Sequence, residues 1–92
     1  MLNNEELKIL AIVAKINMDE EYPTLQKIAE LSPLNKTKTL SVLISLENNG
    51  LVDSGNALIS LGTWSRVWVL EEDGFKIIEN YIEKLKQGDI NG

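Results

Sequence analysis

The chain has 92 residues, a formal net charge of −5, and neither cysteine nor histidine. This length corresponds to one small domain with a single hydrophobic core. Without cysteine there is no disulfide framework, zinc ribbon or thiol nucleophile. Without histidine the commonest general base and the commonest metal ligand are both missing. We therefore expect no enzyme activity, no metal site and no cofactor.

The sequence shows no targeting or membrane signal. No apolar run approaches the roughly 20 residues that a transmembrane helix needs. The segment Met1–Lys8 is acidic and polar, which is unlike a signal peptide. These features predict a cytoplasmic protein without membrane contact, organised as one domain over residues 1–92 with a core at about 5–87.

The acidic charge is concentrated at the two ends of the chain. Residues 1–23 and 71–92 each carry three more acidic than basic residues, whereas residues 24–49 carry three lysines and two glutamates. Phosphate binding requires Lys and Arg, and an overall pI of about 4.6 argues against it. The distribution of charge matters more than the sum, and only the middle of the chain can tolerate a polyanion.

The first predicted helix is apolar nearly all round, from Leu7 to Ile16. Such a helix is usually buried on more than one side. Asn3 or Asn4 is suited to cap its start. We interpret it as the central core helix, with the alternative that it also meets a second subunit.

Two further helices follow. Thr24 is placed to cap a short helix that Pro33 prevents from continuing. Asn35 is placed to cap a third helix running to about Asn49, with Gly50 as its C-terminal glycine.

The third helix has two distinct faces when its residues are placed about 100° apart. The apolar arc holds Leu40, Val42, Leu43, Ile44 and Leu46, and the opposite arc holds Thr37, Lys38, Ser41, Ser45, Asn48 and Asn49. Whether Leu40 and Ile44 are both buried is open. The polar side chains are small, which suits close approach to another surface.

A hairpin and a last helix complete the predicted order. Asp53–Asn56 is a strong turn cluster, and Ala57–Leu61 and Trp64–Leu70 are typical of two strands around a turn at Gly62–Thr63. Both faces of the second strand are partly apolar, so we expect the hairpin to be covered on more than its core side. After Glu71 the spacing of the apolar residues predicts an amphipathic helix.

This order of elements resembles the winged helix-turn-helix superfamily. Within it, the sequence is most similar to MarR-like and small archaeal winged-helix regulators. Three segments carry the resemblance: Thr24–Leu31, which is similar to the first helix of the motif; Leu46–Val52, similar to the passage from recognition helix to wing; and Val69–Gly74, similar to the exit from the wing. Two features depart from the family's pattern. Pro33 stands where glycine is more usual, and Arg66 is the only basic residue of the wing. The fold class expected is α+β, mostly α, with three helices, a β-hairpin wing and a C-terminal helix.

The resemblance implies sequence-specific binding of double-stranded DNA by a transcriptional regulator, with the helix at 35–49 in the major groove. The candidate DNA-binding residues are Asn35, Lys36, Thr37, Lys38, Ser41 and Ser45, together with the basic residues Lys27 and Arg66. Two simpler interpretations stand beside this one. Asn35 serves as a helix cap, and Ser41 and Ser45 are part of a solvated face.

A homodimer is expected through the terminal helices. Phe75, Ile78, Ile82 and Leu85 recur at helical spacing and form an apolar seam. The alternative is that this helix only closes the core of the monomer. A second functional hypothesis is a protein–protein module that never binds DNA, with Trp64 as the anchor for a protein partner and Trp68 in the core.

Overall fold

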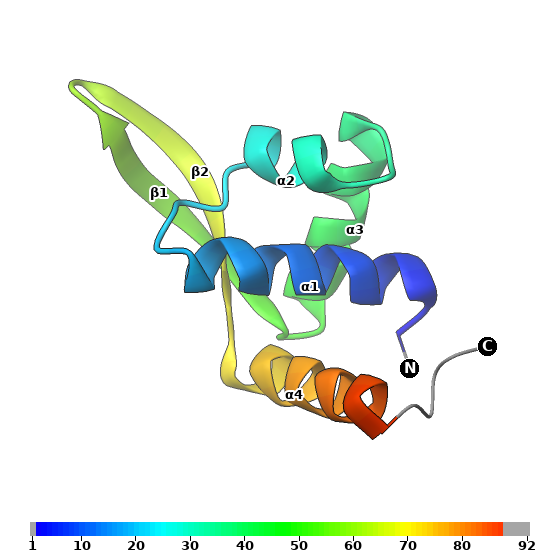
Figure 1. Cartoon of the computed structure of the whole chain (residues 1–92). Helices are drawn as coiled ribbons and strands as arrows, with labels where there is room; N and C mark the ends of the chain where they lie inside the picture. Colours follow the sequence, from blue (N-terminus) through cyan, green and yellow to red (C-terminus); the bar gives the residue numbers. More distant parts are fainter. Residues whose placement is uncertain (1, 88–92) are drawn as a thin grey trace.

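The computed structural model describes the backbone of residues 2–87 and the side chains of residues 2–84 (Figure 1). The chain forms three helices, an antiparallel hairpin and a fourth helix, in the order that the sequence predicts. The elements are α1 (Asn4–Met18), α2 (Leu25–Leu31), α3 (Lys36–Asn48), β1 (Val52–Ser60), β2 (Thr63–Leu70) and α4 (Glu72–Gln87).

Polar caps fix the starts of the first three helices. Asn3 and Glu6 form a reciprocal capping box, in which each side chain accepts a hydrogen bond from the backbone N–H of the other. Thr24 Oγ1 accepts from the N–H of Lys27, and Asn35 Oδ1 accepts from the N–H of Lys38 at 2.8 Å. The predicted caps are confirmed, and they set where α2 and α3 begin.

Gly50 ends α3 and turns the chain into the wing. Its φ of 74° lies in the left-handed region, which a residue without Cβ adopts at no steric cost. The Gly50 N–H donates to the carbonyl of Glu47, and the Leu51 N–H donates to the carbonyl of Leu46. This pair of bonds is the Schellman arrangement, so the predicted C-terminal glycine is confirmed.

The hairpin is longer than the sequence predicts. Asp53–Asn56, which we expected as a turn, lies inside β1 and pairs with Arg66–Val69 of β2. The cross-strand pairing of β2 overrides the local turn preference of these residues. The chain reverses at Leu61 and Gly62, one residue earlier than predicted, and Gly62 has a φ of 73°.

The core surrounds α1, as the apolar first segment predicts. The buried members are Ile9, Leu10, Val13, Ala14, Ile16, Ile28, Leu43, Leu46, Leu51, Val52, Trp68 and Ile78. They come from all four helices and both strands. Trp68 is buried among them, as predicted, and closes the base of the wing against the helices.

Backbone N–H groups of β2 hold the base of the wing through hydrogen bonds on two sides. Leu70 N–H donates to Asn17 Oδ1 at the end of α1, and Trp68 N–H donates to the carbonyl of Pro23 before α2. An isolated bridge joins Thr24 to Val67. The root of the hairpin is therefore fixed relative to α1 and α2.

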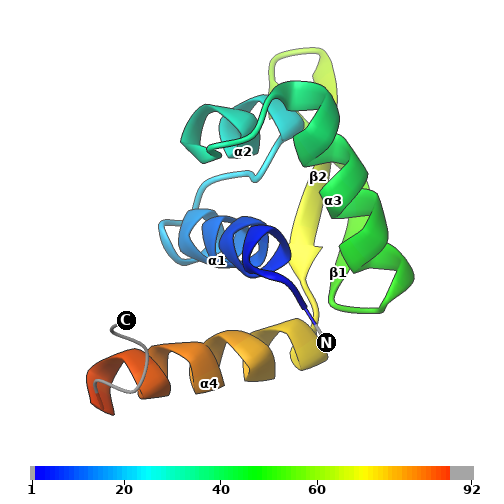
Figure 2. The same cartoon turned by 90° about the vertical axis from the view of Figure 1, so that its right-hand side faces the viewer.

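The two ends of the molecule are built from different elements. The tip of the hairpin extends beyond the helices at the end that also holds α2 and the start of α3, while α4 lies at the opposite end (Figures 1 and 2). Helices suitable for crossing a membrane, by length and hydropathy, are absent from residues 2–87.

Candidate nucleic-acid interface

The outward face of α3 is a narrow uncharged stripe. Thr37, Ser41, Ile44 and Asn48 are all exposed, and at about 100° per residue they fall within an arc of roughly 60°. The opposite face, with Thr39, Leu43 and Leu46, is buried. The open question about the apolar arc is thereby answered: Leu40 packs against the core, whereas Ile44 is 43% exposed.

Lys36 and Lys38 flank this stripe at the first turn of α3. Both side chains are exposed. Among the described residues, no carboxylate forms an ion pair with either ammonium group. The two lysines therefore place positive charge that is accessible to a ligand beside the start of the stripe.

Three other candidates make contacts within the chain. Asn35 uses its side-chain oxygen to cap α3, Ser45 Oγ donates to Glu6 Oε2 of α1 at 3.3 Å, and Lys27 pairs with Glu21. The structure thus brings Lys36, Thr37, Lys38 and Ser41 together on one exposed surface. It places Asn35, Ser45 and Lys27 in local structural roles beside that surface.

Arg66 lies in the wing but is engaged with α3. Its Nη2 lies 3.4 Å from Glu47 Oε1 and 3.2 Å from Ser54 Oγ, and Ser54 Oγ in turn donates to Glu47 Oε2 at 3.0 Å. The guanidinium carbon lies 4.8 Å from the centre of the Trp68 ring. A guanidinium in this position is attracted to the face of the ring. The cluster joins the wing to the C-terminal turn of α3.

A shallow groove of about 370 Å³ joins the wing to the helix-turn-helix. Its walls come from the start of α2, from the start of α3 and from the wing, and they carry amide, hydroxyl and ammonium donors. The lining residues are Thr24, Leu25, Gln26, Lys36, Ile59, Thr63 and Ser65. The sequence does not single out Gln26, Thr63 and Ser65, because they meet Lys36 only through the packing of the wing against α2.

The tip of the wing is apolar and exposed. Leu61 is fully exposed and Trp64 is 67% exposed, and Leu58 and Ile59 are exposed beside them. Leu58 pairs directly with Trp64 across the hairpin. The expectation that the hairpin is covered on more than its core side is wrong for this tip within the monomer. The helices reach only the root of the hairpin.

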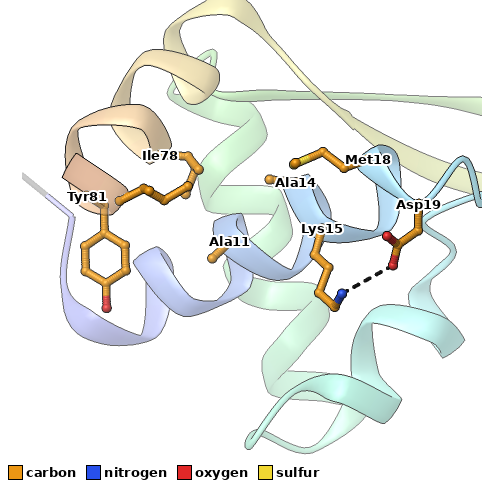
Figure 3. Close-up of a pocket in the computed structure, with 8 residues that line it drawn as sticks. Ala11, Ala14, Lys15, Met18, Asp19, Ile78 and Tyr81 are labelled. Atoms are coloured by element: carbon orange, nitrogen blue, oxygen red, sulfur yellow. Dashed lines mark hydrogen bonds and ion pairs between the residues drawn. The ribbon is translucent and has the colours of Figure 1, made fainter. Parts of the chain in front are cut away.

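A second apolar surface runs along α1 and α4 at the other end. Two adjoining hollows of about 320 and 330 Å³ share Ala14, Met18, Ile78 and Ile82. Figure 3 shows one of them, where Lys15 and Asp19 form an ion pair at its edge. Tyr81 of α4 also lines this hollow.

The predicted seam divides between this surface and the core. Ile78 is only 5% exposed and belongs to the monomer's own core, whereas Phe75 and Ile82 are 50% and 42% exposed. The side chain of Leu85 lies outside the described residues. The helix therefore closes the monomer and also leaves an apolar face uncovered.

No group of three or more acidic side chains that could hold a metal ion occurs among the described residues. The acidic clusters at Asp19–Glu21 and Glu71–Asp73 lie near the ends of α1 and α4 and are exposed.

Several solved structures share this fold of four helices and a two-stranded hairpin. A protein from Archaeoglobus fulgidus superimposes with a TM-score of 0.78 at 15% identity, covering 100% of this chain and 94% of that one. BpsR of Bordetella bronchiseptica, whose DNA binding is regulated by 6-hydroxynicotinic acid, gives a TM-score of 0.73 at 14% identity, covering 94% of this chain and 57% of its own. A MarR-family protein of Bacillus stearothermophilus gives 0.70 at 22% identity, covering 95% and 56%. The chain spans little more than half the length of these two bacterial proteins.

These likenesses define the fold as a winged helix-turn-helix, in which α2 and α3 form the helix-turn-helix and β1 and β2 form the wing. The predicted fold class is confirmed. No protein-family model matches the sequence, and no curated protein is significantly similar to it. The comparisons give no support to a protein partner at Trp64.

Proposed function

We propose that this protein is a DNA-binding regulator of transcription that places α3 in the major groove as a homodimer. The observation that carries this proposal is the exposed, uncharged stripe of α3 with Lys36 and Lys38 at its start. Small hydroxyl side chains and an exposed isoleucine suit base edges and thymine methyl groups, and the lysines suit phosphate or guanine.

The charge distribution supports this orientation. The acid-rich helix α4 lies at the end opposite the start of α3, so a duplex at α3 is distant from the most acidic helix (Figure 2). The Glu47 carboxylate on α3 is paired with Arg66. A protein with a net charge of −5 can therefore present a surface to DNA that is locally neutral or positive.

The homodimer is proposed from the uncovered face of α4. Phe75 and Ile82 lie beside the exposed Met18 of α1, which makes one apolar surface from two helices. A second copy seated there would bury it symmetrically. Two α3 helices related by a two-fold axis would read half-sites about one helical turn apart.

The direct test is fluorescence anisotropy of a labelled duplex of random sequence at about 50 and about 200 mM salt. If a dimer places Lys36 and Lys38 of each copy at phosphates, roughly four counterions are released, and affinity falls by about 100-fold across that range. The Lys36→Ala/Lys38→Ala variant should bind more weakly and with a flatter salt dependence. Lys84→Ala on α4 is the matched control and should leave both unchanged. Absence of binding at low salt would contradict the proposal.

A further inference from the structure

Ile44 is an apolar side chain in the middle of the uncharged stripe of α3. It is 43% exposed, although the nearby Leu43 and Leu46 are fully buried. Ser41 lies about one turn before it and Asn48 about one turn after it, and both are exposed. An isoleucine that is exposed to this extent adds little to the core of the monomer, so its apolar character points outward.

The surroundings of Ile44 on this face are polar. Thr37, Ser41 and Asn48 share its arc, and Ile44 is the one exposed large apolar residue of α3. A protein–protein interface has an apolar core, which a single isoleucine among hydroxyl and amide groups does not provide. The major groove of DNA, in contrast, presents single methyl groups among hydrogen-bonding atoms. The composition of the stripe therefore matches base edges better than it matches a protein surface.

Charged groups that recognise a G·C pair are missing from the middle of α3. Guanine is read chiefly by Arg or Lys, and α3 has no basic residue after Lys38. At 1.5 Å per residue, Ile44 lies about 9 Å further along the helix than Lys38. A carboxylate can accept from the amino group of cytosine, but Glu47 is already paired with Arg66.

The same part of α3 carries groups that suit an A·T pair. An apolar side chain packs against the C5-methyl group of thymine, and an asparagine amide can bind N6 and N7 of adenine together. Asn48 is exposed one turn after Ile44. The hydrogen bond to the carbonyl of Ser45 is donated by Asn49 and not by Asn48.

We propose that Ile44 determines the base preference of this protein by packing against the C5-methyl group of thymine in the major groove, with the Asn48 amide placed for an adenine beside it. This inference rests on the proposed function and adds to it the chemical group that is recognised. Because contact with a methyl group neutralises no phosphate, it changes affinity without changing the salt dependence.

The experiment uses two labelled duplexes of the same A·T-only sequence, one made with thymidine and the other with deoxyuridine. They differ only in the C5-methyl groups of the major groove. Loss of one buried methyl group should weaken binding about fourfold, by the same factor at low and at high salt. Ile44→Ala should bind the two duplexes equally. Val69→Ala is the matched control, because Val69 is a β-branched residue of β2 that is 42% exposed, and it should keep the preference.

A second pair of duplexes separates the methyl group from the shape of A·T-rich DNA. In a G·C-only duplex, 5-methylcytosine carries its methyl group at the same ring position as thymine, without the narrow minor groove of A-tracts. The unmodified chain should bind the methylated duplex more tightly than the unmethylated one, and Ile44→Ala should bind both equally. Circular dichroism checks that the variants are folded.

The outcomes separate the inference from the proposed function. If the unmodified chain binds thymidine and deoxyuridine duplexes equally while Lys36→Ala/Lys38→Ala weakens binding, DNA binding stands and the inference is wrong. A preference for methylated duplexes that persists in Ile44→Ala would also overturn it, because another residue or the shape of the DNA would then account for the preference. If the unmodified chain binds no duplex at low salt, the proposed function fails and the inference fails with it.

Discussion

Thr39 Oγ1 donates a hydrogen bond to Ser32 Oγ over 3.1 Å, and this contact joins the first turn of α3 to the residue that ends α2. Thr39 is fully buried, and Ser32 Oγ also accepts from the N–H of Leu34 at 2.9 Å. One hydroxyl thus organises the turn around Pro33. The two hydrogen bonds link the end of α2 to the first turn of α3, the helix that carries the stripe.

Removing the Thr39 hydroxyl, which donates to Ser32 Oγ, should destabilise the fold. In Thr39→Val the side chain keeps its shape, but Ser32 Oγ loses one of its two hydrogen-bond partners and keeps only the Leu34 N–H. We expect a loss of about 1 kcal/mol in the free energy of unfolding. Urea denaturation measures it. Thr37→Val, at an exposed position two residues earlier, should change stability by less than about 0.5 kcal/mol. Equal effects of the two substitutions would show that the buried hydrogen bond has no special role.

The start of α4 requires a residue without a side chain. A Cβ on Gly74 would lie 2.2 Å from the carbonyl oxygen of Leu51, which already accepts from the N–H of Glu71. Gly74→Ala should therefore force α4 away from the root of the wing and cost about 1–3 kcal/mol of stability, as overpacking usually does. Gly55→Ala is the control, because nothing lies within 4 Å of its Cβ position. The midpoints of thermal unfolding of the two variants test this prediction. An unchanged midpoint for Gly74→Ala would contradict it.

The uncovered face of α4 makes a prediction about assembly. Ile82→Glu places a charge in the apolar surface beside Met18 and Phe75, and in a two-fold interface each substitution counts twice. We expect a dimer for the unmodified chain and at least a roughly tenfold weaker dimer for the variant, which is a cost of about 1.4 kcal/mol or more. Sedimentation velocity over a concentration series measures this. Leu31→Glu, an exposed leucine on α2, should leave the dimer intact. A monomer at all concentrations for the unmodified chain would exclude the interface.

Local signals were enough to predict most of the fold. Asn35 caps α3 through a contact three residues along the chain, and Gly50 ends the helix through its own φ. Such features depend on neighbours in sequence. The predicted turn at Asp53–Asn56 was wrong because these residues form a strand by pairing with residues 66–69. Turn preferences take account of neighbours in sequence only.

The candidate site was harder to predict because some of its side chains form hydrogen bonds or ion pairs with residues distant in the sequence. Ser45 is polar and on the right face of α3, but it donates to Glu6, 39 positions earlier. Arg66 is the only basic residue of the wing, but it contacts Glu47, 19 positions earlier. Within the part of the chain that the structure describes, the side chains of Lys36, Thr37, Lys38 and Ser41 make no such contacts. Residue type alone did not separate the two groups.

The contact between Arg66 and Glu47 leads to the last prediction. Arg66 neutralises a carboxylate on the wing side of α3, close to where a duplex would lie, and Ser54 helps to hold the pair. Arg66→Met should therefore weaken DNA binding by several-fold, because Glu47 would be unpaired and would repel phosphate. It should change stability by less than about 1 kcal/mol, since the pair is partly exposed.

A double substitution distinguishes this role from direct contact with DNA. If Arg66 acts by neutralising Glu47, adding Glu47→Gln to Arg66→Met restores most of the affinity, because the repelling charge is gone. If Arg66 itself binds phosphate, the double variant binds as weakly as Arg66→Met, with a lower salt slope. Anisotropy titrations of the two single variants and the double variant at two salt concentrations complete the cycle. Restored affinity would make Arg66 a positioning residue that keeps the surface between α3 and the wing free of negative charge.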